Sequence, residues 1–388
     1  MLGEINLQLG LDLFLDTYYK KFDGKKIGLI TNMTGVNAKL QPTIDLLYNH
    51  PGIQLTTLFA PEHGIRGDEK EGAQIDSSVD PYTGLPVISL YGENRKPSED
   101  MLENVDVLIF DLQDLGSRYY TYIYTMAYAM EACEKYNKEF VVLDRPNPIN
   151  GLVVEGNLVE ADVRSFVGLL PIPNRHGMTV GELAQLFQGE YGYRCQLTVV
   201  PMKGWQRDTY YDETNLFWIP PSPNASSVDM SVLYTGTCLL EGTNLSEGRG
   251  TVKPFEYVGA PFINGYELAQ IFNEAKLPGV IARPVSFIPT YQKYNGEICS
   301  GIQIHITNRN EVQSLKTGIK LIEIIQRMYP NDFEFKRNEN GKYFFDLIAG
   351  TKKLKDMIKR GESNIFLKEC EDETKEFIDL RKKYLLYT

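Results

Sequence analysis

Several residue patterns that mark common enzyme classes are missing from this sequence. No GxGxxG turn follows the first apolar run and no GxxxxGK[ST] segment occurs, so nucleotide-dependent chemistry is disfavoured. No GxSxG elbow is present, which argues against a Ser/His/Asp hydrolase. The five cysteines are scattered and form no CxxC pair, so neither a disulfide framework nor a thiolate metal site is indicated.

Histidine is also scarce. The four histidines stand at positions 50, 63, 176 and 305, and none lies in an HxH or HExxH spacing. We therefore expect no metal and no cofactor. The alternative is a hard cation held by Asp111, Asp114 and His63.

The sequence also lacks an excess of positive charge, and it lacks a long apolar run. Lys and Arg number 40 against 51 Asp and Glu, a net charge of −11, so nucleic acid and anionic membranes are poor partners. No apolar segment reaches the ~18 residues that a membrane-spanning helix needs. The first residues lack the basic and apolar regions of an export signal, and the residues alone leave the compartment open.

What the sequence does contain is a series of short apolar runs separated by helical patterns. Its 388 residues predict two domains, which we place at 1–155 and 156–388. The first is expected to be an α/β domain with a doubly wound parallel sheet, and the second a smaller α+β domain. The strands expected in the first domain cover 25–32, 52–59, 85–91, 105–111 and 140–143.

Glu62 and His63 are the first candidates for acid/base chemistry. They follow the apolar run 52–59, which Pro61 ends by fixing φ and removing a backbone donor. They would therefore lie on the loop at the carboxyl end of a strand, where ligands bind in open parallel sheets. The alternative is an acid that caps a helix beside a structural histidine.

Two further strand ends carry charged residues. Arg118 could bind an anionic substrate group through its planar guanidinium, or it could cap its strand through a salt bridge to Asp111 or Asp114. The segment 144–148, which reads DRPNP, predicts a rigid turn locked by its own ion pair, with contact to a ligand as the alternative.

The segment 241–251 is the second strong signal. Three glycines surround Glu241, Glu247 and Arg249, and glycines allow the backbone to approach a ligand closely. A plain surface loop is the alternative. Tyrosine is abundant, with 24 residues against two tryptophans, and a minority of these rings could line a sugar-type pocket.

Taken together, these segments resemble the family of NamZ-type exo-β-N-acetylmuramidases, formerly a domain-of-unknown-function family. The resemblance runs through about two thirds of the chain. It rests on the segments 30–32 (ITN), 59–64 (FAPEHG), 111–114 (DLQD), 116–122 (GSRYYTY), 143–148 (LDRPNP), 223–224 (PN), 241–244 (EGTN) and 248–251 (GRGT).

The resemblance implies a Rossmann-like domain without a nucleotide, joined to a smaller C-terminal domain, with the active cleft between them. The implied reaction removes N-acetylmuramic acid from the non-reducing end of peptidoglycan chains, with peptidoglycan-derived saccharides as partners. Glu62 resembles the family's catalytic carboxyl. The resemblance also implies an extracytoplasmic location and association with the cell envelope.

The residues fit that chemistry independently. Glycoside cleavage usually needs two carboxyl groups, about 5–5.5 Å apart for retention or ~6.5–9.5 Å for inversion. Glu62, with His63 beside it, could be paired with Glu241, Glu247 or Asp114. Because N-acetylmuramic acid carries a lactyl carboxylate, its pocket should contain a cation, and Arg118 and Arg249 are the candidates. The expected substrate-binding residues are Asn32, Arg118, Tyr120, Tyr122, Asn224 and Arg249.

Two other functions stay open on the residues alone. One is a non-catalytic module that binds peptidoglycan or another glycan in the same cleft. The other is a metal-assisted amidase or esterase.

Overall fold

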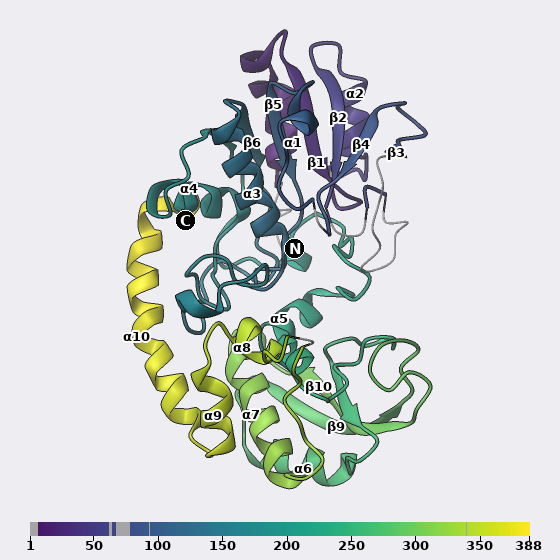
Figure 1. Ribbon diagram of the computed structural model, residues 1–388, viewed down its shortest axis with the longest axis vertical. Helices are drawn as coiled ribbons and strands as arrows, with labels where there is room; N and C mark the ends of the chain where they lie inside the picture. The colour runs from purple at the N-terminus through teal and green to yellow at the C-terminus, as the bar shows by residue number, and fades with distance from the viewer. Residues whose placement is uncertain (1–6, 62–63, 67–77, 93, 339) are drawn as a thin grey trace, which may run out of the picture.

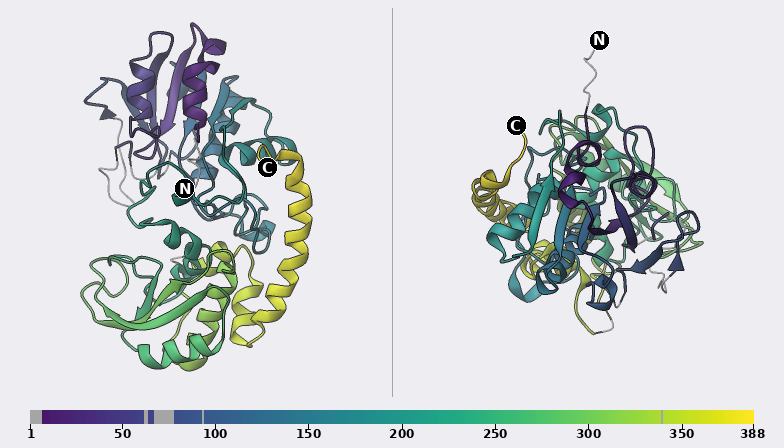
Figure 2. Two further views of the ribbon diagram at one scale, coloured as in Figure 1. Left: turned by 180° about the vertical axis from the view of Figure 1, so that it is seen from behind. Right: turned by 90° about the horizontal axis from the view of Figure 1, so that it is seen from above.

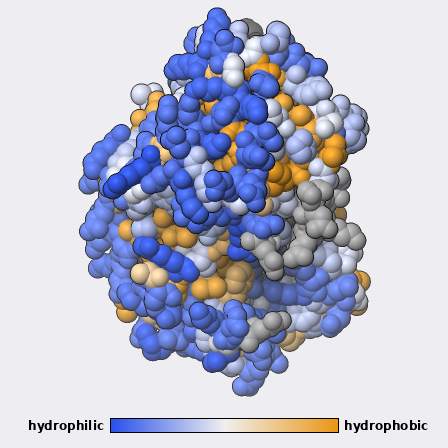
Figure 3. Space-filling view, turned by 45° about the horizontal axis from the view of Figure 1, so that its top comes forward, coloured by the Kyte–Doolittle hydropathy of each residue, from blue (hydrophilic) through white to orange (hydrophobic). Residues whose placement is uncertain are grey.

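The computed structural model describes residues 7–61, 64–66, 78–92, 94–338 and 340–388. Within these ranges the chain forms two lobes, each built around its own β-sheet (Figure 1). Figure 3 shows that hydrophilic residues cover most of one face, with hydrophobic residues exposed in separate patches. None of the helices in these ranges has both the length and the apolar character needed to cross a bilayer.

The first lobe contains a mostly parallel sheet. In the described part of the chain it has seven strands in the order β3-β4-β2-β1-β5-β6-β7, and only the β3-β4 pair is antiparallel. The strand order reverses between β1 and β5, so the predicted doubly wound sheet is confirmed. The strands are β1 (Lys26–Thr31), β2 (Gln54–Ala60), β3 (Ser78–Val79), β4 (Pro86–Ser89), β5 (Val107–Asp111), β6 (Glu139–Leu143) and β7 (Gln196–Val200).

Helices cover both faces of this sheet, which explains why its central strands are apolar throughout. Every residue of β5 is buried, and its alternating side chains enter two different cores. Ile109 packs in the core under α1 (Gly10–Asp16) and α2 (Thr43–Tyr48). Phe110 packs in the core under α3 (Tyr122–Lys135) and α4 (Val180–Glu190).

The first sheet continues beyond the domain boundary expected at residue 155. β7 pairs in parallel with β6, and α4 lies between them in the sequence. Neighbouring parallel strands need a crossover of a dozen or more residues, and here it runs from Leu143 to Gln196 with α4 as its helix. The division into 1–155 and 156–388 therefore does not coincide with the edge of the sheet.

The second lobe is the predicted α+β unit. Its three described strands form an antiparallel sheet in the order β8-β10-β9. Asn264 caps α6 by accepting hydrogen bonds from the backbone N–H groups of Tyr266 and Glu267. The elements are α5 (Val228–Thr237), η5 (Cys238–Gly242), β8 (Tyr257–Ala260), α6 (Gly265–Glu274), β9 (Val280–Phe287), β10 (Cys299–Ile306), α7 (Ser314–Met328), α8 (Phe344–Ala349) and α9 (Lys353–Lys359).

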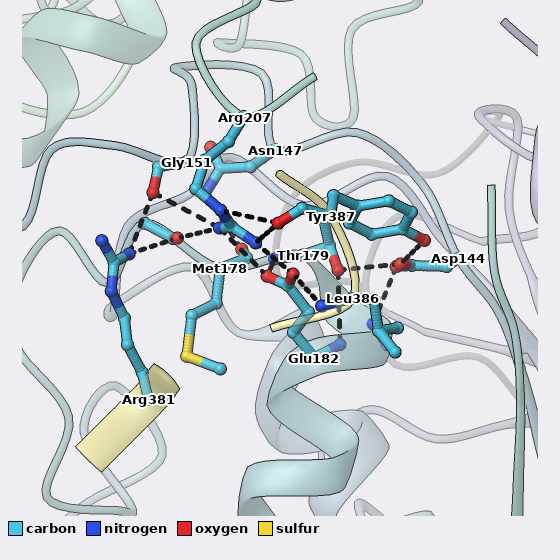
Figure 4. A network of polar contacts seen from close by, with 12 residues as sticks. Asp144, Asn147, Gly151, Met178, Thr179, Glu182, Arg207, Arg381, Leu386 and Tyr387 are labelled. Atoms are coloured by element: carbon cyan, nitrogen blue, oxygen red, sulfur yellow. Dashed lines mark hydrogen bonds and ion pairs between the residues drawn. The ribbon is translucent and has the colours of Figure 1, made fainter. Parts of the chain in front are cut away.

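The C-terminal helix connects the two lobes. α10 (Ser363–Arg381) begins beside α9 in the second lobe and runs along the side of the molecule to the first lobe, near α4 (Figures 1 and 2). Beyond it, the backbone N–H of Leu386 donates to Glu182 Oε1 at 2.8 Å, and the Tyr387 hydroxyl donates to Asp144 Oδ2 at 2.5 Å (Figure 4). The end of the chain is thus anchored to the first lobe.

Candidate functional site

A cavity of about 400 Å³ lies between the carboxyl end of the first sheet and the second lobe. This size falls within the ~300–1,000 Å³ of typical small-molecule pockets. The lining residues from the first lobe and its loops are Tyr91, Arg95, Leu115, Tyr119, Tyr120, Thr121, Tyr122, Ser165, Phe166, Val167, Ser222 and Asn224. Those from α5 and the second lobe are Met230, Tyr234, Glu241, Arg249, Phe255, Phe344 and Leu347.

Glu241 and Arg249 supply the paired charges of the cavity wall. Glu241 stands in η5, directly after α5, and Arg249 follows in the glycine-rich segment. Arg249 Nη2 lies 2.7 Å from Glu241 Oε1, and the guanidinium lies 5.0 Å from the centroid of the Phe255 ring. The structure therefore brings two of the predicted site residues together, and the segment is more than a plain surface loop.

Glu247, the second acid of this segment, lies outside the cavity lining. Its side chain is 2% exposed and contacts Arg249 Nε at 3.4 Å and Lys293 Nζ at 2.9 Å. Lys293 also donates to the carbonyl oxygens of Leu240 and Leu245, at 2.9 Å each. Glu247 and Lys293 therefore fix the backbone that carries Glu241 and the guanidinium of Arg249.

Asp114 is buried at the rim of the first sheet and is not among the lining residues. Its Oδ2 accepts a hydrogen bond from the backbone N–H of Gly116 at 2.7 Å and lies 3.4 Å from His176 Nε2. His176 Nδ1 accepts a hydrogen bond from the backbone N–H of Met178 at 3.2 Å, so the Nε2 side of the ring faces Asp114. Sequence reasoning gave His176 no part in the site.

Asn32 and Tyr122 lie together at the end of β1. Asn32 Nδ2 donates to the Tyr122 hydroxyl at 2.8 Å, and that hydroxyl donates to the carbonyl oxygen of Pro221 at 2.7 Å. Tyr122 lines the cavity, whereas Asn32 supports it from behind the wall. The pair ties the carboxyl end of β1 to the loop that carries the lining residues Ser222 and Asn224.

Tyr120 and Asn224 both line the cavity, as predicted for substrate-binding residues. Burial raises the pKa of Tyr120 well above its ordinary value, so the phenol stays protonated and can donate a hydrogen bond. Its ring packs edge-on against Tyr122, with the ring centroids 4.8 Å apart. Asn224 Oδ1 accepts from the Tyr291 hydroxyl at 2.8 Å. That bond orients the Asn224 amide.

Arg118 does not reach the cavity, contrary to the prediction that it binds an anionic substrate group. Its side chain is fully buried and donates to four backbone carbonyl oxygens. The acceptors are Asn157 at 2.6 Å, Ile172 at 3.1 Å, Ile348 at 2.9 Å and Ala349 at 2.8 Å. The alternative, a salt bridge to Asp111 or Asp114, is also wrong. Arg118 instead joins first-lobe loops to α8 of the second lobe.

The segment 144–148 is not locked by its own ion pair. Arg145 Nε lies 2.5 Å from Asp111 Oδ1, which places the ion pair between two strand ends. Asp144 instead accepts hydrogen bonds from the Thr179 hydroxyl and the Gly181 N–H, at 2.8 Å each, and from Tyr387 (Figure 4). Neither Asp144 nor Arg145 lines the cavity.

Glu62 and His63 lie outside the described residues, so the prediction of acid/base chemistry for them stays a prediction. β2 ends at Ala60, which pairs with Ser89 of β4, and the cavity residues Tyr91 and Arg95 follow β4 directly. The sequence thus places Glu62 two residues after a strand whose neighbour leads into the cavity wall.

Arg66, close to this segment, contacts Asp80. Its Nε lies 2.8 Å from Asp80 Oδ1. Burial alone would raise the pKa of Asp80, but the bonds from Arg66 and Thr83 lower it to about 2. The described ranges contain no group of three His, Cys, Asp or Glu side chains placed to bind a metal; His63 is outside them.

Sequence reasoning missed several lining residues, among them Arg95, Phe166, Tyr234 and Phe255. Arg95 had a usable signal, because it follows the end of a predicted parallel strand by a few residues. Phe166 had none, since it stands in a long crossover without a regular pattern.

Almost the whole chain matches known proteins. Family models described as exo-beta-N-acetylmuramidase NamZ, N-terminal and C-terminal, match residues 27–229 and 232–387. The peptidoglycan beta-N-acetylmuramidase NamZ of Bacillus subtilis is 49% identical over 383 residues, which are 98% of this chain and 91% of that protein.

Two solved structures agree with this match. Both are crystal structures of DUF1343 family proteins from Bacteroides fragilis. One has a TM-score of 0.92 at 38% identity and covers 99% of this chain and 100% of its own. The other has a TM-score of 0.80 at 31% identity and covers 99% of each chain. This chain belongs to the NamZ exo-β-N-acetylmuramidase family.

Proposed function

We propose that this protein is an exo-acting glycosidase that releases N-acetylmuramic acid from the non-reducing end of peptidoglycan fragments. The observation that carries the proposal is the cavity between the lobes, in a chain that matches the family over almost its full length. Its wall combines aromatic rings with one carboxylate and two guanidinium groups, which suits a sugar that carries both apolar ring faces and an acid.

Among the three candidate partners for Glu62, the geometry favours Glu241. Glu241 lines the cavity, whereas Glu247 is paired with Arg249 and Lys293 behind it, and Asp114 is buried beside His176. We propose that Glu62 serves as the acid that protonates the leaving oxygen and that Glu241, paired with Arg249, is the second carboxyl group. Tyr120 and Asn224 would orient the sugar through hydrogen bonds.

Substitution of the two acids tests this assignment. Glu62→Gln and Glu241→Gln should each lower kcat on a chromogenic β-N-acetylmuraminide by about 10²–10⁴-fold, the usual contribution of a positioned acid or base. Glu334→Gln is the control, because Glu334 is a 67% exposed second-lobe side chain outside the cavity. An unchanged kcat in Glu241→Gln would show that Glu241 is not the second carboxylate. Glu247 and Asp114 would then be the remaining candidates.

The product decides between catalysis and simple binding. Incubation with a muramic-terminated disaccharide should yield free N-acetylmuramic acid by mass spectrometry. Tight binding in calorimetry without product after long incubation would instead identify a glycan-binding protein and overturn the proposal.

We also propose that the protein acts outside the cytoplasm, where its polymeric substrate lies, in association with the cell envelope. The family membership supports this location. Fractionation of the source cells, with the muraminidase activity followed in each fraction, tests it. Activity confined to the cytoplasmic fraction would contradict it.

A further inference from the structure

Arg95 is a cation at the cavity that no carboxylate of the protein neutralises in the described ranges. It lines the cavity from the loop that follows β4. Its Nε is buried and has no hydrogen-bond partner among the described residues. The Nε atoms of Arg118, Arg175 and Arg381 are buried without a partner as well, so what distinguishes Arg95 among these four is its place in the cavity wall.

An aromatic ring supports this guanidinium. The Arg95 guanidinium lies 4.3 Å from the centroid of the Phe166 ring. Phe166 stands on a tight turn closed by hydrogen bonds between the backbones of Ser165 and Gly168, and its ring stacks on Tyr128 with an interplanar angle of 8°. Contact with a ring face holds a guanidinium in place and leaves its N–H groups, which point outward in the plane, available to an acceptor.

Arg249, the other guanidinium of the cavity, is in a different electrostatic situation. It lies within ion-pair distance of Glu241 and Glu247, so its charge is already balanced by protein carboxylates. An anionic ligand group placed beside this pair would meet the negative charge of Glu241. The same group placed beside Arg95 would meet a positive charge that no carboxylate of the described residues balances.

From these observations we infer that Arg95, supported by Phe166, binds the lactyl carboxylate and thereby selects muramic over glucosamine substrates. The inference rests on the proposed function, because only a muramic sugar presents that carboxylate. Under this inference the cation that binds the carboxylate is Arg95, a residue that the sequence did not single out. Arg118 cannot take this part, because its Nη groups donate to backbone carbonyls.

Steady-state kinetics on three chromogenic substrates tests the inference: the muraminide, its neutral lactyl amide and the glucosaminide. In the wild type, KM should be lowest for the muraminide. Arg95→Gln should raise that KM by about 10–100-fold, the usual effect of losing a charge-assisted hydrogen bond. It should change KM for the two uncharged substrates little, with kcat largely preserved. Arg95→Lys should recover part of the affinity.

Lys96→Gln is the matched control. Lys96 is the next residue and also lies over an aromatic ring, 5.5 Å from the Tyr128 centroid, but it is paired with Glu131 and does not line the cavity. It should behave as the wild type. Phe166→Leu should raise KM for the muraminide selectively, though less than Arg95→Gln.

Two failures can be told apart. If the wild type cleaves none of the three substrates, the proposed function fails. If the wild type cleaves the muraminide and Arg95→Gln keeps its preference over the lactyl amide, the inference about Arg95 is overturned while the proposed function stands.

Discussion

Arginine side chains have two different roles in this protein, and the roles differ in how deeply the side chains are buried. Arg118, Arg145 and Arg207 are at most 5% exposed and bind backbone carbonyls or carboxylates of the protein itself. Arg95 and Arg249 line the cavity, where a ligand can reach them. The Nη groups of Arg118 donate to backbone carbonyls, so they are not available to a substrate.

Replacement of Arg118 should therefore lower the stability of the fold and leave substrate preference largely unchanged. Arg118→Met leaves four carbonyl oxygens without their donor at the junction of the lobes. We expect the free energy of unfolding to fall by about 3–5 kcal/mol, from several lost charge-assisted bonds with partial compensation by water. Urea denaturation followed by fluorescence measures it.

A loss below about 1 kcal/mol, combined with a selective rise in KM for the muraminide, would restore the original prediction that Arg118 binds substrate. Glu334→Gln again supplies the surface control.

The positions of single residues also explain which members of the site could be predicted from the sequence. Four residues that the sequence marks as candidates, Glu241, Arg249, Tyr120 and Asn224, line the cavity, and all four stand in motif segments of the sequence. The sequence cannot tell Arg118 from Arg95, since both follow predicted strand ends. Only the burial of each guanidinium separates an arginine that braces the lobes from one that faces the cavity.

At the scale of elements, the sequence pattern predicts most strands of the parallel sheet but few of the antiparallel sheet. β1, β2, β4, β5 and β6 stand out as short apolar runs because helices cover both faces of their sheet. β9 contains Pro284 and alternates buried with exposed positions irregularly, so its sequence does not resemble a strand. The sheet order accounts for this, since β9 is an edge strand, where proline is tolerated.

The predicted division at residue 155 falls before β7, the last strand of the first sheet along the chain, for a related reason. Between β6 and α4 the chain crosses more than thirty residues without a regular helix or strand apart from the short turn η3 (Ala161–Val163). A change of pattern of this length resembles a linker in the sequence. In the structure it remains part of the first lobe and supplies Ser165, Phe166 and Val167 to the cavity.

At the scale of the whole molecule, the C-terminal segment fastens the second lobe to the first. Residues after α10 reach Glu182 and Asp144, which stand on α4 and at the end of β6 (Figure 4). The cavity depends on both lobes, so anything that loosens this anchor should also loosen the cavity wall.

The anchor should make stability depend on pH. Burial raises the pKa of Asp144 to about 7, although bonds from Tyr387, Gly181 and Thr179 oppose the rise. Between the ordinary pKa of Asp144, 3.8, and this value, the native state binds a proton that the unfolded state has lost. Stability contributed by this group therefore falls as pH rises from about 4 to 7 and levels off above that.

Tyr387→Phe should lose more stability at pH 8 than at pH 5. At pH 8 Asp144 is ionised in the native state, and the bond donated by the Tyr387 hydroxyl goes to a charged acceptor. Such bonds contribute about 1.5–3 kcal/mol, against about 0.5–1.5 kcal/mol for a neutral acceptor. Thermal and urea unfolding at the two pH values measure the difference.

Tyr384→Phe is the matched control, because its hydroxyl donates at 2.6 Å to Glu190, an acceptor at the molecular surface. It should cost little and equally at both pH values. If Tyr387→Phe also loses the same amount at pH 5 and pH 8, Asp144 does not titrate in this range and the anchor is neutral or charged throughout. A larger loss at pH 5 would mean that the bond serves the protonated carboxyl, contrary to the donor direction seen in the structure.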